Sequence, residues 1–384
     1  MPPSCLAYDW SKRWLCWRSY CRGGNLVEPK TEPARLIPIS GLRACMVNLF
    51  TRVGIQAEFG EQIATMLLDG ELRGHESHGV HLVRYVTEEV RRGVLNAQPN
   101  ITTVHETSGA LLLDGDRGIV VPAVQAMRWC LERVKAGSPM AVAGVRNCQP
   151  VALGFYVRMA AEAGMLGFAC TNAIPSVAPP GGRTATVGTN PFAYGVPTGH
   201  HGAVVFDAAT TALAGMAVQL AAEDGRELPR DVLLDQDGYP TTDPGARSRG
   251  GSMAPLGYPA AAHKGFGLAV MVEILAAVLT GAAIGRDLLD SPGRFGCTVW
   301  ALDPAPFMPL PQFRRRMDEL VEQIKQGDRM DSAVELPLPG ERGERRFKEL
   351  TDRGAVGLSP RTWNALTQVC ESLDVQLPGE AGSV

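Results

Sequence analysis

The chain has 384 residues, of which 45% are hydrophobic and 20% are charged. This composition is typical of a globular protein with two or three domains. A net charge of −3 argues against a protein that binds nucleic acid through an overall basic surface. The nine cysteines form no CxxC pair, so we expect reduced thiols in the cytoplasm and no zinc knuckle. No apolar run is long enough to predict a membrane span.

The first 35 residues differ from the rest of the chain. They hold three of the six tryptophans and three of the nine cysteines, and they lack the apolar stretch of a secretory signal. We therefore expect residues 1–35 to be a disordered N-terminal extension.

Helical spacing of apolar residues dominates the next hundred positions. It predicts a helix from Ser40 to Gly54, a second helix around Ile63, and a third that includes residues 70–86 and ends near Gly93. A short buried strand is expected at 109–114, and another helix begins at Pro122.

From residue 140 the predicted strands alternate with helices, which indicates an α/β architecture. The expected strands are 140–145, 165–171, 202–207 and 297–303. The expected helices are 151–164, 265–282, 310–327 and 360–373. The helix at 265–282 is apolar nearly all round, so we expect it to be deeply buried. Two long irregular connections, 171–199 and 235–257, are of the kind that usually carries function.

Three of the seven histidines, His75, His78 and His81, fall within the third predicted helix. A helical metal site favours histidines four residues apart with a nearby carboxylate, and HExxH does not occur here. Ser77 and Gly79 flank His78, and these small residues leave room for a ligand. Metal binding, acid–base catalysis and ordinary packing all remain open on spacing alone.

Generic nucleotide-binding motifs do not settle the function, because neither GxGxxG after a strand nor GxxxxGK[ST] occurs. Asp207 ends a predicted strand, where it either contacts a ligand or caps a helix. Lys264 lies at the start of the helix 265–282, where backbone amides favour anions.

A set of longer strings carries more information. In order along the chain they are "ESHGV", "TNAIPSVAPPGGR", "VGTNPFAYGVPTG", "VVFDAATT", "HKGFGLAVMVEIL" and "PLPGERG". Together they resemble the type-2 malate/L-lactate dehydrogenase family over residues 38–350. The resemblance implies a bilobed, non-Rossmann NAD(P)-binding α/β fold with mixed sheets and flanking helices. It implies a main domain of residues 36–120 plus 266–384, a cofactor-binding domain of residues 121–265, and a homodimer.

The same resemblance implies roles for individual residues. Ser77, His78 and Asp207 match catalytic positions, with His78 as proton donor and the carboxylate orienting its imidazole. Cofactor contacts are implied for Gln149, Gly188, Thr189, Asn190, Asp207, Ala208, Ala209, Lys264, Leu338, Pro339 and Gly340. Substrate contacts are implied for His81, Arg84, Thr171 and Asn172. No metal is expected.

Two departures from the family pattern concern substrate binding and proton transfer. Gln149 stands where family members often have a histidine, and glutamine cannot accept a proton near neutral pH. Leu82 stands where an arginine usually grips the substrate carboxylate, so His81 or Arg84 would have to replace it.

The expected function is hydride transfer between a nicotinamide and a small 2-hydroxy or 2-oxo acid. Arginines at 342, 345 and 346 would suit a 2′-phosphate, yet NAD is slightly favoured over NADP. The alternatives are a cyclic 2-imino acid reductase and a degenerate, non-catalytic nucleotide-binding relative.

Overall fold

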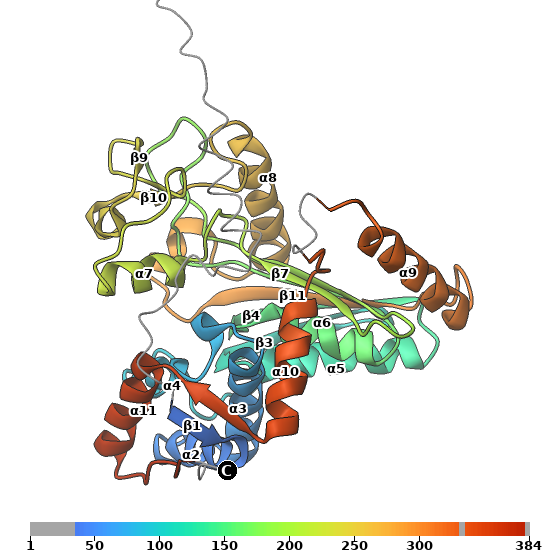
Figure 1. Cartoon of the computed structure of the whole chain (residues 1–384), viewed down its shortest axis with the longest axis horizontal. Helices are drawn as coiled ribbons and strands as arrows, with labels where there is room; N and C mark the ends of the chain where they lie inside the picture. The colour runs from blue at the N-terminus through green and yellow to red at the C-terminus, as the bar shows by residue number, and fades with distance from the viewer. Residues whose placement is uncertain (1–34, 330–334, 381–384) are drawn as a thin grey trace, which may run out of the picture.

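The computed structural model describes residues 35–329 and 335–380. The predicted extension therefore lies outside the described residues, except for Arg35. In the described chain a central sheet separates a lower group of helices from an upper lobe (Figure 1). Among the described helices, none combines the length and apolar character needed to cross a membrane.

The central sheet has seven strands in the order β2-β3-β4-β11-β5-β6-β7. Their bounds are β2 (Thr102–Glu106), β3 (Ala110–Ile119), β4 (Met140–Gln149), β5 (Leu166–Thr171), β6 (Phe192–Val196), β7 (Val204–Ala208) and β11 (Phe295–Leu302). The β3–β4 pair is parallel and the other neighbouring pairs are antiparallel. A Rossmann sheet is mostly parallel, so this mixed order confirms the predicted non-Rossmann α/β class.

Two helices, α5 (Val121–Lys135) and α6 (Leu153–Glu162), pack on this sheet. Inward-facing β4 residues such as Ala143 and Val145 are fully buried beneath them. The sheet approaches α6 closely at Gly195, where a Cβ atom would lie 2.4 Å from the carbonyl oxygen of Val157. A larger residue there would push the helix away from the sheet.

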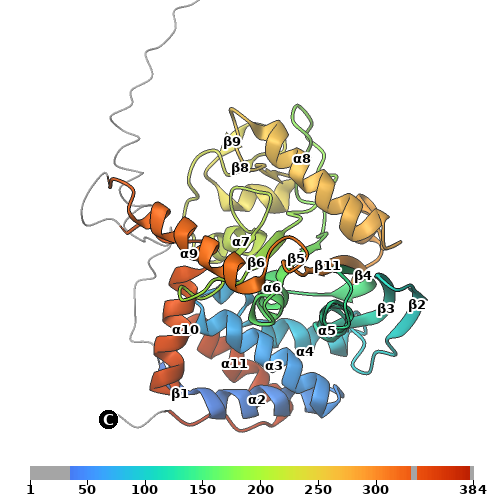
Figure 2. The same ribbon diagram turned by 90° about the vertical axis from the view of Figure 1, so that its right-hand side faces the viewer.

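The lower helices are α2 (Ile39–Arg52), α3 (Ala57–Leu72), α4 (Leu82–Arg91) and α11 (Pro360–Leu373). The start of the described chain pairs with a segment near its other end. There β1 (Arg35–Pro38) forms an antiparallel two-stranded ribbon with β12 (Ala355–Leu358). The fully buried side chains of Leu42, Met46 and Leu67 belong to the core that this layer shares with the central sheet. The charged helix α10 (Glu341–Arg353) packs beside α3 (Figure 2).

The upper lobe has a small core of its own, which includes Val177, Val218 and Met253. Its elements are α7 (Gly215–Glu223), β8 (Leu233–Leu234), β9 (Pro240–Thr241), β10 (Ser252–Met253) and α8 (Ala262–Glu273), which continues as a π-helical turn, Ile274–Val278. A further helix, α9 (Leu310–Lys325), contacts the β6–β7 turn through Asp318.

The helix predicted at 265–282 is present as α8 and its π-helical continuation, but the expectation of deep burial is wrong. Met271, Ile274 and Val278 expose 37%, 51% and 57% of their surface. Apolar residues all round a helix normally mean that every side is covered. Here one side is left uncovered in the single chain.

Several short or polar elements were not predicted. Every residue of β2 is exposed, so its sequence has no inward-facing apolar pattern. The helix α10 is mostly charged, and β6 lies within the connection expected to be irregular at 171–199. The sheet also takes strands from both expected domains, because β3, β4 and β11 are neighbours. The expected boundary after residue 120 therefore runs through one continuous sheet.

Candidate active site

His75, His78 and His81 lie on the connection between α3 and α4. The helix α3 ends at Leu72, residues Glu76–His78 form one 3₁₀ turn, and α4 begins at Leu82. The prediction of one helix through residues 70–86 is therefore wrong. Gly74 has a φ of +82°, a conformation that ends a helix and that glycine adopts without strain.

The turn that carries His78 packs very closely against the end of α3. A Cβ atom at Gly70 would lie 2.5 Å from the carbonyl oxygen of His78. A Cβ atom at Gly79 would lie 2.3 Å from Oε2 of Glu71. These two glycines let the backbone of the turn rest directly on the helix, which fixes the position of the His78 backbone.

Glu71, near the end of α3, is hydrogen-bonded to the segment that follows His78, a role that the sequence analysis missed. Its side chain is buried, and Oε2 accepts a hydrogen bond from the amide of Val80 at 2.9 Å. Burial raises the pKa of Glu71 to about 7. The string "MLLDGEL" holds two acidic residues, Asp69 and Glu71, within an otherwise uncharged and mostly apolar stretch, and this was the available signal.

Ser77 and His78 form a side-chain pair, as their adjacency suggested. Oγ of Ser77 lies 2.9 Å from Nδ1 of His78, which orients the ring and turns Nε2 away from Ser77. Loss of surrounding water lowers the pKa of His78 below its ordinary value. The imidazole is therefore mainly neutral at pH 7. Nearby negative charge would raise its pKa and allow it to take up a proton.

Asp207, at the end of β7, interacts with the start of α6 and with His75. Its Oδ2 accepts a hydrogen bond from the amide of Gly154 at 2.6 Å, so it caps α6 rather than the segment that follows it. Burial lowers the pKa of His75, and the charge of Asp207 opposes that shift. The carboxylate implied for His78 thus acts on His75 in this structure, where it raises the pKa of His75 while His78 lowers it.

His75 and Asp207 lie close enough for the charge of Asp207 to act on His75. Both are accessible to solvent, yet loss of hydration is the largest influence on each pKa, lowering that of His75 and raising that of Asp207. Arg158 lies beside them, held by an ion pair with Asp69. A histidine and a carboxylate with shifted pKa values, next to each other and to Arg158, are of the kind that functional sites often contain.

Asn172 and Asn190 meet at the buried carboxylate of Glu273, on α8. The Nδ2 atoms donate to Glu273 at 3.2 Å from Asn172 and at 2.7 Å from Asn190. The Oδ1 atoms accept backbone amides, from Gly296 for Asn172 and from Ala173 for Asn190. The structure gives these two amides a structural role, because their donors and acceptors are already used within the chain.

Thr171 shares that environment, since its hydroxyl donates to the carbonyl of Gly296 at 2.8 Å. Gly188, on the neighbouring loop, lies against Ala173, since a Cβ atom at Gly188 would be 2.3 Å from the carbonyl oxygen of Ala173. The carbonyl of the next residue, Thr189, accepts the amide of Thr210 at 2.9 Å. Glu273 was another residue that the sequence analysis missed. A single charge in the apolar run "AVMVEILAAV" was the visible signal.

Gln149 pairs with Tyr85 across the junction of β4 and α4. Their side chains lie 2.9 and 3.0 Å apart, with each group able to donate to the other. Both side chains are partly buried, so the pair links the sheet to the helix that follows the histidine turn.

A pocket of about 210 Å³ lies between β7 and α10. Leu338 and Pro339 line it, and the carbonyl of Pro339 accepts a hydrogen bond from Val205 at 3.1 Å. Gly340 is required at the next position, because a Cβ atom would lie 2.7 Å from the carbonyl oxygen of Val205. The other lining residues are His201, Ala203, Val204, Glu341, Glu344, Arg345 and Lys348.

The remaining residues of the expected site are more scattered. Ala208 and Ala209 follow Asp207 and are half-buried. Lys264 is exposed at the start of α8, and it does not line the pocket that contains Leu338. Arg84 is exposed on α4, where it forms an ion pair with Glu88 at 2.7 Å. The structure thus pairs Ser77 with His78 in one turn, and Asp207 acts on His75 of the same turn. Lys264 and Arg84 are not among the groups that act on these histidines.

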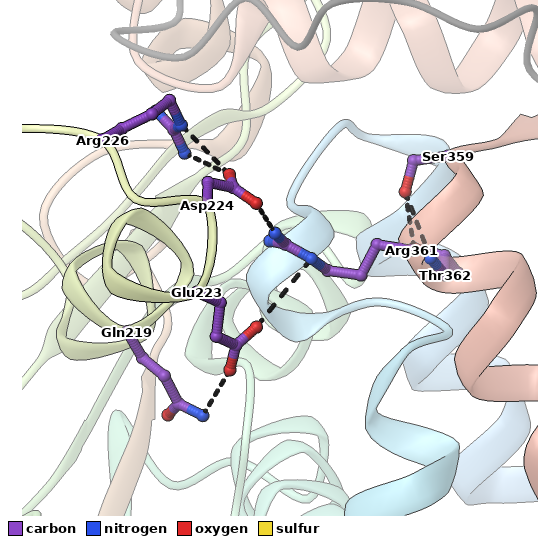
Figure 3. Close-up of polar contacts among 7 residues, drawn as sticks. All are labelled: Gln219, Glu223, Asp224, Arg226, Ser359, Arg361 and Thr362. Carbon is purple, nitrogen blue, oxygen red and sulfur yellow. Dashed lines mark hydrogen bonds and ion pairs between the residues drawn. The ribbon is translucent and has the colours of Figure 1, made fainter.

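Arg361 of α11 connects the lower helices to α7 of the upper lobe (Figure 3). Its Nε lies 3.9 Å from Oε2 of Glu223, and its Nη2 pairs with Asp224, which also binds Arg226. The charges of Arg361 and Glu223 also act on the histidine turn. Arg361 lowers the pKa of His81, and Glu223 raises it. This ion-pair cluster was not predicted, since its halves lie far apart in sequence.

Sequence comparisons relate most of the chain to one group of enzymes. A model of the malate/L-lactate dehydrogenase family matches residues 37–367. An L-sulfolactate dehydrogenase from Methanothermobacter thermautotrophicus is 31% identical over 338 residues, which cover 86% of this chain and 95% of that protein. A Delta(1)-pyrroline-2-carboxylate/Delta(1)-piperideine-2-carboxylate reductase from Pseudomonas putida is 31% identical over 350 residues, which cover 89% of this chain and 98% of that one.

The fold comparison agrees with these similarities. The structure of a malate dehydrogenase from Pyrococcus horikoshii matches with a TM-score of 0.82 and 26% identity. The match covers 91% of this chain and 99% of that one, so both lobes and the central sheet are included.

Proposed function

Because the chain belongs to the malate/L-lactate dehydrogenase family, we propose that it transfers hydride between NAD(P) and a small 2-oxo or 2-hydroxy acid. The Ser77–His78 pair is the observation that carries this proposal. When bound, a reduced nicotinamide supplies the hydride. The protein must then supply a proton to the oxygen that becomes the hydroxyl.

His78 is the proposed proton donor. Hydride addition to C2 of a 2-oxo acid breaks the C=O π bond and leaves negative charge on oxygen, and a proton from imidazole completes the hydroxyl. The Nδ1 contact with Ser77 holds the ring so that Nε2 faces away and can serve this oxygen. The negative charge of the bound acid and of the developing alkoxide favours protonation of an imidazole whose pKa burial has lowered.

The pocket beside Leu338 fits the adenosine end of a dinucleotide. Ala203, Val204 and Pro339 give it apolar walls, and residues of α10 add charges at its edge. We favour NAD over NADP, because the carboxylates Glu341 and Glu344 line the pocket together with Arg345 and Lys348, which leaves no excess of positive charge for a 2′-phosphate. Arg345 is in addition committed to Glu335 at 3.0 Å.

His81 is the proposed contact for the substrate carboxylate. The residue after it is Leu82, so the arginine common in the family is missing here. Nε2 of His81 is buried and has no hydrogen-bond partner among the described residues, so a ligand would satisfy it. Arg84 is a weaker candidate, because it is exposed and paired with Glu88.

A second candidate substrate class is a cyclic 2-imino acid. The similarity to the Pseudomonas putida reductase favours it, since that relative is as similar as the sulfolactate dehydrogenase. The same proton donor serves both classes, because reduction of a C=N bond also places the proton on the heteroatom.

We further propose a homodimer formed through α8. The apolar side chains Met271, Ile274, Val278 and Leu279 expose 37–62% of their surface on one side of this helix and its continuation. An apolar patch of this kind on a well-packed chain marks an interaction site. Ile274→Asp combined with Val278→Asp is expected to yield a monomer in light scattering, and a dimeric variant would contradict the assignment.

The thiols favour a cytoplasmic location. The six cysteines of the described residues are free and buried. Even Cys45 and Cys370, whose Sγ atoms share a hydrogen bond at 3.5 Å, form no disulfide. We therefore propose that the enzyme works in a reducing compartment.

The test of the proposed activity is a nicotinamide absorbance assay. Purified protein is mixed with NADH or NADPH and with pyruvate, oxaloacetate, sulfopyruvate or cyclic imino acids. We expect turnover with at least one acid, and His78→Ala is expected to lower kcat by about 10²–10⁴-fold. His105→Ala, which changes an exposed histidine of β2, is the matched control. Tight NADH binding without turnover on any acid would instead indicate a non-catalytic relative.

A further inference from the structure

A second group of histidines lies outside the site described above, at the turn between β6 and β7. His200 and His201 are adjacent in this turn, and Glu322 reaches them from α9. One ligand atom of each side chain lies within 4.8 Å of the other two, and all three residues are exposed. Ligands of a tetrahedral zinc ion lie about 3.4 Å apart, as Zn–N and Zn–O bonds of about 2.0–2.2 Å imply. Small rotations of exposed side chains bridge that difference.

Asp318 provides a second, independent observation that favours a cation beside His200. It is only 4% exposed, and its Oδ1 accepts the amides of Gly199 at 2.9 Å and His200 at 3.3 Å. Its Oδ2 is buried and lies 3.1 Å from Nε2 of His200, which is an ion-pair distance. The geometry is nevertheless unsuitable for a hydrogen bond, so Oδ2 accepts none. A buried carboxylate oxygen without a donor is costly unless positive charge lies close by.

The backbone of the β6–β7 turn packs directly against the carboxylate of Asp318. A Cβ atom at Gly199 would lie 2.0 Å from Oδ2 of Asp318, so glycine is needed for the turn to cover it. Asp318 and Glu322 are four residues apart on α9, a spacing that puts both carboxylates on one side of the helix. The turn and the helix therefore bring two imidazoles and the carboxylate of Glu322 together, with Asp318 beside His200.

We propose that His200, His201 and Glu322 bind a divalent transition-metal ion of the zinc class, with Asp318 orienting His200. Imidazole nitrogens combined with a carboxylate select zinc, cobalt or nickel over calcium and magnesium, which prefer oxygen ligands alone. A buried carboxylate that contacts a metal-binding histidine is a common second contact in zinc sites. The sequence analysis expected no metal, because the two halves of this cluster are more than a hundred residues apart.

A metal ion at this point would fasten α9 to the β6–β7 turn. His201 also lines the pocket that contains Leu338 and Pro339, so the ion would fix one edge of that pocket. The proposed metal is structural, and the hydride transfer proposed above does not depend on it.

The test uses the full chain without an affinity tag, stripped of metal with a chelator. Zn²⁺ binding is measured by competition with a chromophoric chelator, and Co²⁺ binding by its visible absorption. We expect one equivalent of each ion to bind and Zn²⁺ to raise the melting temperature. Glu322→Gln and the double variant His200→Ala/His201→Ala are expected to bind at least tenfold more weakly, and Asp318→Asn about 10–100-fold more weakly. His105→Ala is the matched control and should bind as the wild type does.

Two results would overturn the proposal. One is wild-type Zn²⁺ affinity in both Glu322→Gln and the double histidine variant. The other is a near-ultraviolet thiolate charge-transfer band in the Co²⁺ complex, which would assign the ion to cysteines. Glu322 is exposed, so its substitution leaves the fold intact even where a histidine or Asp318 variant proves unstable. Circular dichroism of each variant checks that the fold is retained.

Discussion

Oε2 of Glu71 accepts a hydrogen bond from the amide of Val80 at 2.9 Å, and this contact ties the end of α3 to the turn that carries His78. The carboxyl group is almost fully buried, and burial raises its pKa from 4.5 to about 7. An acid that titrates near neutral pH therefore contacts the turn that carries the proposed proton donor, His78.

Glu71→Gln is expected to change how stability depends on pH. Because the pKa of Glu71 is higher in the folded chain, its contribution is complete below pH 4.5 and is lost as the pH rises through about 7. At 1.36 kcal/mol per pKa unit, the wild type loses about 3 kcal/mol over that range through this group. Glutamine still accepts the amide of Val80 and does not titrate, so the variant should avoid this loss.

The measurement is urea unfolding of wild type and variant between pH 4.5 and 8. Glu319→Gln, at an exposed position of α9, is the matched control and should follow the wild type. An unfolding free energy difference between Glu71→Gln and wild type that stays constant with pH would disprove the assigned titration.

The lowered pKa of His78 predicts opposite pH profiles for the two reaction directions. Reduction needs the protonated imidazole, so kcat/KM for the 2-oxo acid should fall as pH rises through a pKa below 6.5. Oxidation needs the neutral imidazole, so its kcat/KM should rise through the same pKa. Steady-state rates from pH 5 to 9 measure both, and a reduction rate independent of pH would refute the role of His78.

Asp207→Ala is expected to weaken the start of α6, because Oδ2 of Asp207 accepts the amide of Gly154. Loss of a helix cap of this kind costs about 1 kcal/mol of unfolding free energy. The pKa of His75 should fall further, since Asp207 now raises it. Asp207→Asn keeps a capping oxygen but loses the charge, so it should retain the stability and share the lower pKa. Chemical unfolding and histidine NMR titration separate the two effects, and equal stability of Asp207→Ala and wild type would contradict the cap.

Arg361→Gln and Glu223→Gln should shift the pKa of His81 in opposite directions. Arg361 lowers that pKa and Glu223 raises it, so the first variant raises the pKa and the second lowers it. These side chains are 35% and 50% exposed, so each variant should lose at most about 1 kcal/mol of stability. NMR titration of His81 measures the shifts, and a shift in the same direction for both would show that the charges do not act on it.

Elements whose signals are local could be predicted from the sequence. Apolar spacing located α2, α5, α11 and the inner strands, because a residue that faces the core must be apolar wherever the core lies. The adjacency of Ser77 and His78 placed a serine hydroxyl next to an imidazole. The ordered strings around His78, Asp207 and Leu338 indicated the family.

Features that depend on contacts between distant segments could be read only from the folded chain. The structure showed that Asp207 acts on His75 and caps α6, that Asn172 and Asn190 serve Glu273, and that one side of α8 is uncovered. Charges and buried amides choose partners by proximity in space, and no periodicity along the chain records that proximity. For the same reason the cluster of His200, His201 and Glu322 becomes visible only once the β6–β7 turn and α9 are brought together.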